Sequence, residues 1–438
     1  MKKLMKTVLC IAAAWVLLSV PAYGSVLTDY TAPDGVRYRV DFANDGVTAY
    51  CVDKKVTQAT IPTTINGYAV TRIDFTNCGD LVSAEIPEGI RSFCFKNCGK
   101  LTSVTIPDSV TMIDEQTFYK CSSLQYIQLP ETVTMIRDEG FYGCVGLKKI
   151  KLPESLTSIG GKAFSGCKAL ASIDIPETVT YIGVGAFSDC STLSEMKLPD
   201  GLKTIEAETF AGCKKLAEIT IPDSMILIKE NAFQNCTSLK EILLPNQVTD
   251  IYAGAFQNCS KLKTVVLSDS LEYIGYGAFE NCINLKAITI PKSVTTIKAS
   301  AFSGCSKLKV TIPKTVTSIG GYDYNTAELA PFYKVKNAVY QGTSSEVIKA
   351  AISPYAKKFT KHSITLKWTK FTKASSYKIY RYNHITKKWK LLKTIKNPKQ
   401  TSYTVKNLKS GKRYSFRVKV TVNGKSYTST LKLQRVGK

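Results

Sequence analysis

Apolar residues recur every 23 residues through the middle of the chain, in one fixed order of hydrophobic and polar positions. Counted from each cysteine, Leu stands at position +3, and in the first nine repeats Ile or Leu stands at +8, Ile at +15 and Phe at +20. The cysteines that set this count are Cys98, Cys121, Cys144, Cys167, Cys190, Cys213, Cys236, Cys259, Cys282 and Cys305. A fixed period of this length is typical of a solenoid, in which each repeat is one coil stacked on the previous one.

Each repeat predicts two short extended stretches. Apolar residues at +6 and +8 alternate with polar ones, which predicts a strand with inward apolar side chains. Pro at +9, present in eight of the first nine repeats, ends that strand because proline has no N–H to give to a ladder. A second extended stretch, Val-Thr-x-Ile, covers +12 to +15. One coil cannot offset its own backbone entropy, so the array is expected to depend on stacking and to have atypical ends.

The remaining segments predict the organisation of the chain. Residues 1–24 resemble a cleaved secretory signal, with a basic start, an apolar run of 13 residues and a small-x-small site; that run is shorter than the roughly 20 residues that span a bilayer. We expect an N-terminal cap with a degenerate repeat over residues 25–77 and the solenoid over residues 78–320. A C-terminal cap and linker follow over residues 321–358, with a helix starting near Thr343-Ser344-Ser345-Glu346.

Residues 359–438 lose the period and show strict alternation instead. Examples are Ile364-x-Leu366-x-Trp368 and Tyr414-x-Phe416-x-Val418-x-Val420. Several short strands joined by polar turns predict a small β-sandwich. The predicted fold class is therefore an all-β-rich solenoid of 23-residue coils followed by a small antiparallel β-sandwich.

Two family resemblances rest on these motifs. The repeat C-x2-L-x2-I-x-[IL]-P-x-[ST]-[VL]-[TK]-x-I-G-x2-A-F-x2-C resembles the BspA-like leucine-rich repeat family of bacterial surface proteins, over roughly residues 45–320. The resemblance implies secretion or wall association and a role in adhesion, with no particular ligand and no catalytic motif. The run Leu408-x2-Gly411-x2-Tyr414-x-Phe416-x-Val418 resembles the tyrosine corner and F strand of fibronectin type III domains. Trp368 matches the core tryptophan of these domains, so the resemblance implies structural roles for Trp368 and Tyr414.

The net charge of +25 is concentrated at one end of the chain. Residues 357–438 hold 24 Lys and Arg and no Asp or Glu, which leaves 59 − 24 = 35 basic and 34 acidic residues in the rest. Such a block attracts anionic polymers. We expect a tether to an anionic cell-wall polymer, such as teichoic acid or an acidic glycan, and no nucleic-acid partner; solubility alone is the plainer interpretation. The candidate tether residues surround Trp389: Lys387, Lys388, Lys390, Lys393, Lys396 and Lys399.

The polar positions +5 and +7 of the predicted strand are expected to line the concave face, where horseshoe solenoids bind. Glu195, Glu218 and Glu241 lie on three consecutive coils there, and Leu243 and Val266 form a small apolar spot beside them. The alternative is a solvated face that Lys197, Lys240 and Lys263 neutralise. The candidate binding residues are Tyr126, Lys149, Lys151, Glu195, Lys197, Glu218, Glu241, Leu243 and Val266.

The sequence argues against catalysis and against a metal or cofactor. Its only histidines are His362 and His384, and no zinc spacing or phosphate-binding loop occurs. Without Cys10 the chain has 13 cysteines, an odd number, and the periodic ones are expected to be small buried hydrophobes because parallel Cβ vectors suit a disulfide poorly. Cys94 and Cys98 are close enough in sequence for a local disulfide, although buried thiols are the favoured interpretation.

These observations predict a secreted protein, retained non-covalently at the cell surface, with no transmembrane segment. Its solenoid is expected to recognise an extracellular protein or glycan. Two other functions stay open: an envelope scaffold that assembles with itself, and an accessory protein that captures polysaccharide.

Overall fold

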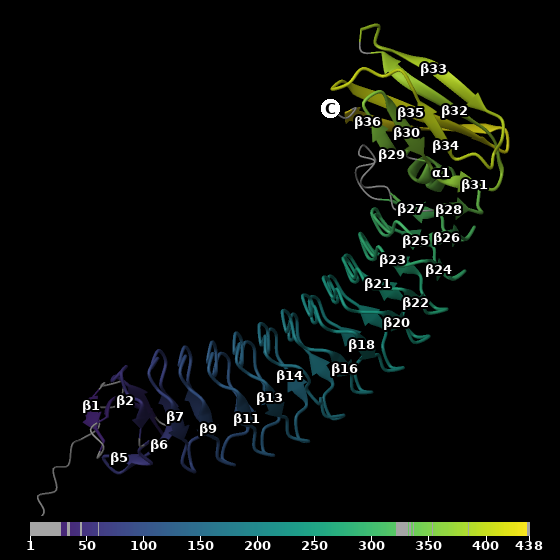
Figure 1. Cartoon of the computed structure of the whole chain (residues 1–438). Coiled ribbons are helices and arrows are strands. Elements are labelled where there is room, and N and C mark those ends of the chain that lie inside the picture. Colours follow the sequence, from purple (N-terminus) through teal and green to yellow (C-terminus); the bar gives the residue numbers. More distant parts are fainter. Residues whose placement is uncertain are drawn as a thin grey trace, which may run out of the picture.

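The computed structural model describes residues 28–32, 36–43, 46–59, 61–320, 332, 334–335, 337–352, 354–383 and 385–435. The predicted signal, residues 1–24, and most of residues 321–336 lie outside this part of the chain. Figure 1 shows a long array of stacked coils that bends into an arc, with a β-sandwich at its C-terminal end. The predicted fold class, a β-solenoid of 23-residue coils followed by an antiparallel sandwich, is confirmed.

An antiparallel meander begins the array. It consists of β1 (Thr28–Thr31), β2 (Arg37–Ala43) and β3 (Gly46–Cys51). β5 (Thr64–Ile65) pairs antiparallel with β6 (Tyr68–Asp74), whereas β4 (Gln58–Ala59) starts a separate parallel sheet. β3 pairs in parallel with β6, and β6 with β8 (Ser92–Cys94). The meander therefore continues directly into the parallel coils.

The predicted first strand of each coil forms at positions +5 to +7, with the residue at +6 packed inward. This series contains β7 (Ser83–Glu85), β9 (Ser103–Thr105), β11 (Tyr126–Gln128), β13 (Lys149–Lys151), β16 (Glu195–Lys197), β18 (Glu218–Thr220), β20 (Glu241–Leu243), β22 (Thr264–Val266), β24 (Ala287–Thr289), β26 (Lys309–Ile312) and β28 (Asn337–Tyr340). These strands pair in parallel in short groups, such as β11 with β13, β16 with β18 and β20 with β22. Residues 172–174 occupy the same place in their coil but carry no strand.

The second extended stretch is shorter than predicted and covers only +14 and +15. Its strands are β10 (Met112–Ile113), β12 (Met135–Ile136), β14 (Ser158–Ile159), β15 (Tyr181–Ile182), β17 (Thr204–Ile205), β19 (Leu227–Ile228), β21 (Asp250–Ile251), β23 (Tyr273–Ile274), β25 (Thr296–Ile297) and β27 (Ser318–Ile319). They form two parallel sheets, β10-β12-β14-β15 and β17-β19-β21-β23-β25-β27. Most coils thus carry a three-residue strand at +5 to +7 on one face and a two-residue strand at +14 and +15 on another.

The core of the array consists of two columns of identical side chains. Stacked Phe rings run without interruption from Phe75 to Phe332, with neighbouring ring centroids 5.0–5.9 Å apart. Beside them, every periodic Cys thiol donates a hydrogen bond to a Phe carbonyl in an earlier coil, at 3.0–3.2 Å. The stacked rings and the thiol hydrogen bonds therefore hold each coil to the coils before and after it.

The C-terminal sandwich has two antiparallel sheets. Its strands are β29 (Tyr355–Thr360), β30 (Ser363–Lys367), β31 (Lys370–Phe371), β32 (Ala374–Asn383), β33 (Lys388–Ile395), β34 (Ser402–Val405), β35 (Arg413–Val422) and β36 (Lys425–Arg435). The sheets are β29-β30-β34 and β33-β32-β35-β36. Trp368 and Tyr377 are buried between them, and the Tyr414 hydroxyl accepts the Lys409 N–H at 2.8 Å, as a tyrosine corner requires.

The solenoid and the sandwich share a sheet. β31 of the sandwich pairs in parallel with β28, the last strand of the array, so the sheet order is β24-β26-β28-β31. The helix start predicted near Ser344 is confirmed by α1 (Ser345–Ala351), whose N-cap is Ser344 and which packs against both β27 and β36. Main-chain pairing and packing therefore connect the two parts of the molecule (Figure 1).

Candidate binding surfaces

The first candidate surface is the row of exposed +5 and +7 side chains on the three-residue strands. The register sets Tyr126 beside Lys149, Glu195 beside Glu218 and Leu243 beside Val266. All nine side chains proposed from the sequence are exposed, because the residue between each pair turns into the core. Whether this row is the concave face, as expected from other solenoids, stays a prediction.

The acidic positions of this row are partly neutralised. Glu195 and Glu218 stand directly opposite each other, which is unfavourable for like charges. The Lys240 Nζ lies 3.5 Å from the Glu218 carboxylate and offsets its charge. Lys197 instead pairs with Glu177, which lies outside the row. The hydrogen bond with Glu177 raises the pKa of Lys197 above its usual value and lowers the pKa of Glu177. Glu195 lacks an ion pair among the described residues, so the row keeps a net acidic spot there.

An apolar spot lies on the next pair of strands. Leu243 is 56% exposed and Val266 is 50% exposed, and their strands pair so that the two side chains are neighbours. Glu241 lies on the same strand as Leu243, but β20 belongs to a different two-stranded sheet from β18. The structure therefore places the acidic pair and the apolar pair on adjacent coils, without one continuous ladder between them.

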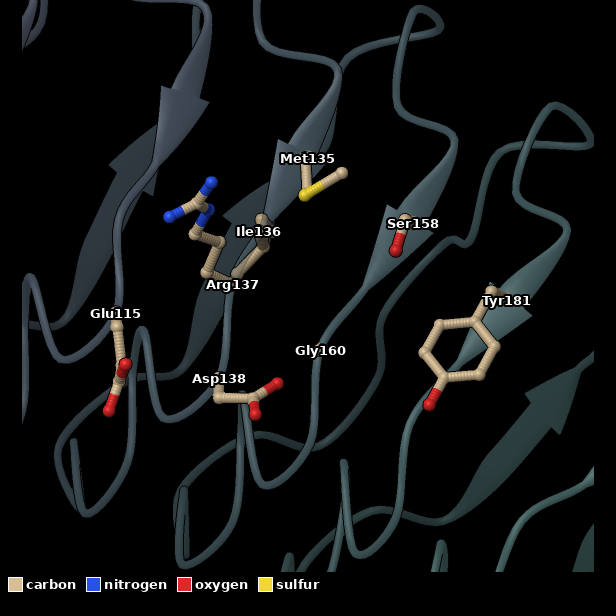
Figure 2. A pocket seen from close by; sticks show the side chains of 8 residues that line it. All are labelled: Glu115, Met135, Ile136, Arg137, Asp138, Ser158, Gly160 and Tyr181. Carbon is tan, nitrogen blue, oxygen red and sulfur yellow. The ribbon is translucent and has the colours of Figure 1, made fainter.

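A second candidate surface, which sequence reasoning missed, is a shallow hollow of about 260 Å³ on the sheet of two-residue strands. Figure 2 shows Met135, Ser158 and Tyr181 on three neighbouring strands, with Arg137 and Asp138 following β12. Met135 is 37% exposed and Tyr181 is 48% exposed. The residue at position +14 varies from coil to coil, with Met, Ser, Tyr, Thr, Leu and Asp among its types, so the sequence carries no distinct signal of this hollow.

The hollow has the features of a contact surface rather than of a catalytic site. Arg137 lies 4.0 Å from Asp114, which also accepts a hydrogen bond from Ser92. Asp138 accepts the Gly161 N–H at 2.6 Å. Two of its charged groups thus already have partners, and its lining is mostly exposed, so it does not form a water-excluding cleft.

The third candidate surface is cationic and lies on the sandwich. The six lysines proposed as a tether are all exposed, on β33 and in the turns that flank it. They lack ion pairs among the described residues, and the sequence of this module supplies no acidic residue to pair with them. The cationic potential of this module is therefore not cancelled from within.

The cysteines and the histidines are the remaining groups that could carry chemistry. The 13 described cysteines, Cys94 and Cys98 included, are free thiols. His362 contacts the Leu408 carbonyl through Nδ1 at 3.2 Å, and His384 lies outside the described residues. In the part of the chain that the structure describes, no cluster of His, Cys, Asp or Glu is placed to hold a metal ion. None of the helices described there is long and apolar enough to cross a membrane.

Comparisons with known proteins find two family models that match the chain. The BspA type leucine rich repeat model matches residues 47–170, 88–217 and 203–330, with six copies, and the fibronectin type III model matches residues 354–434. No curated protein matches the chain.

Three solved bacterial structures are among those similar to the chain. A leucine-rich repeat protein from Bacteroides ovatus is 27% identical, with a TM-score of 0.48; the match covers 73% of this chain and 94% of that one. A leucine rich cell surface protein from Faecalibacterium prausnitzii is 21% identical, with a TM-score of 0.33 and coverage of 73% and 96%. The pneumococcal vaccine antigen PcpA is 18% identical, with a TM-score of 0.45 and coverage of 74% and 90%.

These matched families are binding or structural scaffolds rather than enzyme families, and membership is consistent with a binding role at a cell surface. The repeat model spans more than half of the chain, and the columns of Cys and Phe supply the physical basis of the match. This chain belongs to the BspA-type leucine-rich repeat family and carries a fibronectin type III domain after its repeats.

Proposed function

We propose that this chain is a secreted binding protein in which recognition and retention are separate. The solenoid recognises an extracellular protein or glycan, and the fibronectin type III domain holds the molecule non-covalently to an anionic polymer of the cell wall. The observation that carries this proposal is the separation of charge: 24 basic and no acidic residues in positions 357–438, against a near balance elsewhere. Exposed lysines without acidic neighbours attract a polyanion over a distance that salt limits.

The tether is tested by co-sedimentation of the intact chain with purified Gram-positive walls across a salt series. We expect binding at low salt and its loss near 1 M salt, where the Debye length falls to about 3 Å. Changing Lys387, Lys388 and Lys390 to Gln should weaken binding strongly. The matched control changes three exposed lysines of the solenoid, Lys168, Lys214 and Lys261, to Gln, and should have little effect. Wall binding that survives molar salt unchanged would refute the tether.

Recognition by the solenoid is supported by the adjacent acidic and apolar pairs on the three-residue strands. Glu195 and Glu218 favour a basic partner surface, and Leu243 with Val266 adds an apolar contact. Changing Glu195, Glu218 and Glu241 to Gln should reduce binding to host matrix while leaving wall retention intact. Partner binding that is unaltered in this variant removes the patch from the proposal.

Two competing functions give different outcomes in the same assays. An envelope scaffold predicts self-association of the purified chain in sizing experiments, and loss of this association when Leu243 and Val266 are made polar. An accessory role in polysaccharide capture predicts retention on a neutral glycan column, independent of salt. If the purified chain is monodisperse and is not retained on the neutral glycan column, the result supports separate recognition and retention.

A further inference from the structure

The outward face of the four-stranded sheet of the sandwich carries an arginine stacked on an indole ring. Arg417 lies on β35 between Phe416 and Val418, which are fully buried, so its own side chain projects from the opposite face. Its guanidinium carbon is 4.2 Å from the centroid of the Trp389 ring on β33. Tyr382 on β32 packs against the same indole, with ring centroids 5.1 Å apart, and is the register partner of Trp389. The indole therefore fixes the position of the guanidinium.

Within the described residues, this guanidinium has no acidic neighbour, and its buried Nε has no acceptor. The Arg417 Nε is buried and makes no hydrogen bond within the described residues. By contrast, Arg39 and Arg137 in the solenoid each lie beside an aspartate. Leaving a buried charged donor unpaired is costly, and the sequence after Glu346 contains no acidic residue that could pair with it. A planar fork held in this way matches the two oxygens of a carboxylate or a phosphate.

A second feature of the same face also favours an anion. Lys378 on β32 and Lys419 on β35 are direct register partners, and Lys419 is two residues beyond Arg417, so it projects from the same face. Like charges directly opposite each other in a sheet are destabilising. Both lysines are half-buried, so solvent screens the repulsion between their ammonium groups less than it would at an exposed site. An oxyanion bound between these groups would relieve this repulsion and would supply Arg417 with an acceptor.

We propose that Lys378, Tyr382, Trp389, Arg417 and Lys419 form an oxyanion receptor, which binds a phosphate or carboxylate group of an anionic wall polymer. This inference rests on the proposed tether and deepens it: the exposed lysines attract the polymer, and the receptor holds one charged group of the polymer in a defined geometry. The bond is non-covalent, and Arg417 donates to the oxyanion through its fork.

The experiment measures binding of the intact chain to poly(glycerol phosphate) teichoic acid and, in a second arm, to polygalacturonate at equal charge. Arg417→Gln should weaken binding about tenfold in the arm that supplies the fitting oxyanion, as expected for a charge-assisted pair. The matched control, Lys406→Gln, removes one charge from an exposed site beyond β34 and should change binding less than twofold. Arg417→Lys keeps the charge but loses the fork and the stack, so it should also bind several-fold more weakly.

A measurement on the unaltered chain guards against misfolded variants. Trp368 is buried in the core, whereas Trp389 is half-buried under Arg417. Polymer binding at the receptor should change the Trp389 emission, and the change should vanish in Trp389→Phe. If the unaltered chain binds but Arg417→Lys binds equally well, or Lys406→Gln is as damaging as Arg417→Gln, the receptor is wrong and the diffuse tether stands. If the unaltered chain binds neither polymer, both the proposed tether and the proposed receptor are wrong.

Discussion

At the residue scale, each coil contains a left-handed backbone position directly before its cysteine. The φ angles of these ten residues lie between 56° and 76°. Nine of the ten positions hold Gly, Asn or Asp, the residue types that adopt a positive φ at the lowest cost. Lys120, with a φ of 58°, is the exception. The steric cost of a long side chain there is of the order of 1–2 kcal/mol.

Replacing Lys120 by Gly should therefore stabilise the protein by about 1 kcal/mol. The shift is measured as a higher urea midpoint of unfolding, followed by circular dichroism. Lys168→Gly is the matched control, because Lys168 is exposed and has no positive φ; this change should be neutral or slightly destabilising. A lower midpoint for Lys120→Gly would contradict the explanation by backbone strain.

The column of buried thiols predicts sensitivity to alkali. Burial raises the pKa of Cys144, Cys190 and Cys259 from 9.0 to about 12. A thiol whose folded pKa is raised contributes its full stabilisation below the unfolded pKa, near 9, and loses it as the pH rises toward 12, because only the unfolded chain releases the proton. Each such thiol removes about 1.4 kcal/mol of stability per pH unit in this window.

Urea unfolding at pH 8.0, 9.0 and 9.5 measures this loss. The free energy of unfolding should fall steeply across the series. A variant with Cys144, Cys190 and Cys259 changed to Ser keeps a hydrogen-bond donor at each site but cannot ionise, so its stability should fall less. Equal slopes for the two proteins would show that the thiols do not control alkaline stability.

At the element scale, a coil is stable only between its neighbours. Phe210 is fully buried, and its ring stacks 5.7 Å from Phe187 and 5.4 Å from Phe233. The inter-coil hydrogen bonds of the same turn run from the Phe210 N–H to the Ala232 carbonyl at 2.8 Å. Stability in such arrays is a sum over coils and over the contacts between them.

Phe210→Ala should cost about 3–5 kcal/mol, the usual penalty for removing a buried aromatic ring. Hydrogen exchange should show faster amide exchange in the coils on both sides of residue 210, and little change near β6 or in the sandwich. The exposed Lys214→Ala in the same coil provides the control and should alter stability by less than about 0.5 kcal/mol. Uniform loss of protection along the whole array would mean that the coils unfold as one unit.

At the scale of the whole molecule, the shared sheet predicts a stiff junction between solenoid and sandwich. Tyr340 is fully buried at this junction, where its hydroxyl donates to the Val316 carbonyl at 3.3 Å and its ring meets Phe371 edge-on. The Tyr355 hydroxyl donates to the Val335 carbonyl at 3.0 Å, and the Ser429 hydroxyl to the Ile352 carbonyl at 3.4 Å. Domains joined only by a linker normally move relative to each other; these contacts oppose such motion.

Tyr340→Ala should loosen this junction by removing a buried ring and its hydrogen bonds. We expect faster amide exchange in β31 and α1, and a broader distribution of sizes in small-angle scattering. Tyr340→Phe keeps the ring and should change both only slightly. Scattering and exchange identical to those of the unaltered chain would show that the sandwich is held without this contact.

The repeat could be predicted without a structure, because it depends on side chains that recur at short, fixed intervals. One Cys, Leu, Ile and Phe at fixed positions in every coil specify which side chains turn inward, and Pro at +9 specifies where the first strand stops. The alternation after residue 360 likewise specified the sandwich, and Ser344 the start of α1. The absence of acidic residues after Glu346 was also evident without a structure.

Features that depend on pairing between distant residues could be found only in the folded chain. A second left-handed position, four residues before the first, carries Gln116, Glu139 and Lys162 in successive coils, so residue type gave no signal of it. The break in pairing between β18 and β20, and the hollow around Tyr181, arise from how neighbouring coils stack. Trp389 and Arg417 meet only because β33 and β35 flank β32 in one sheet. Composition gives the charge of that module, but the register of its strands decides which charges can act together.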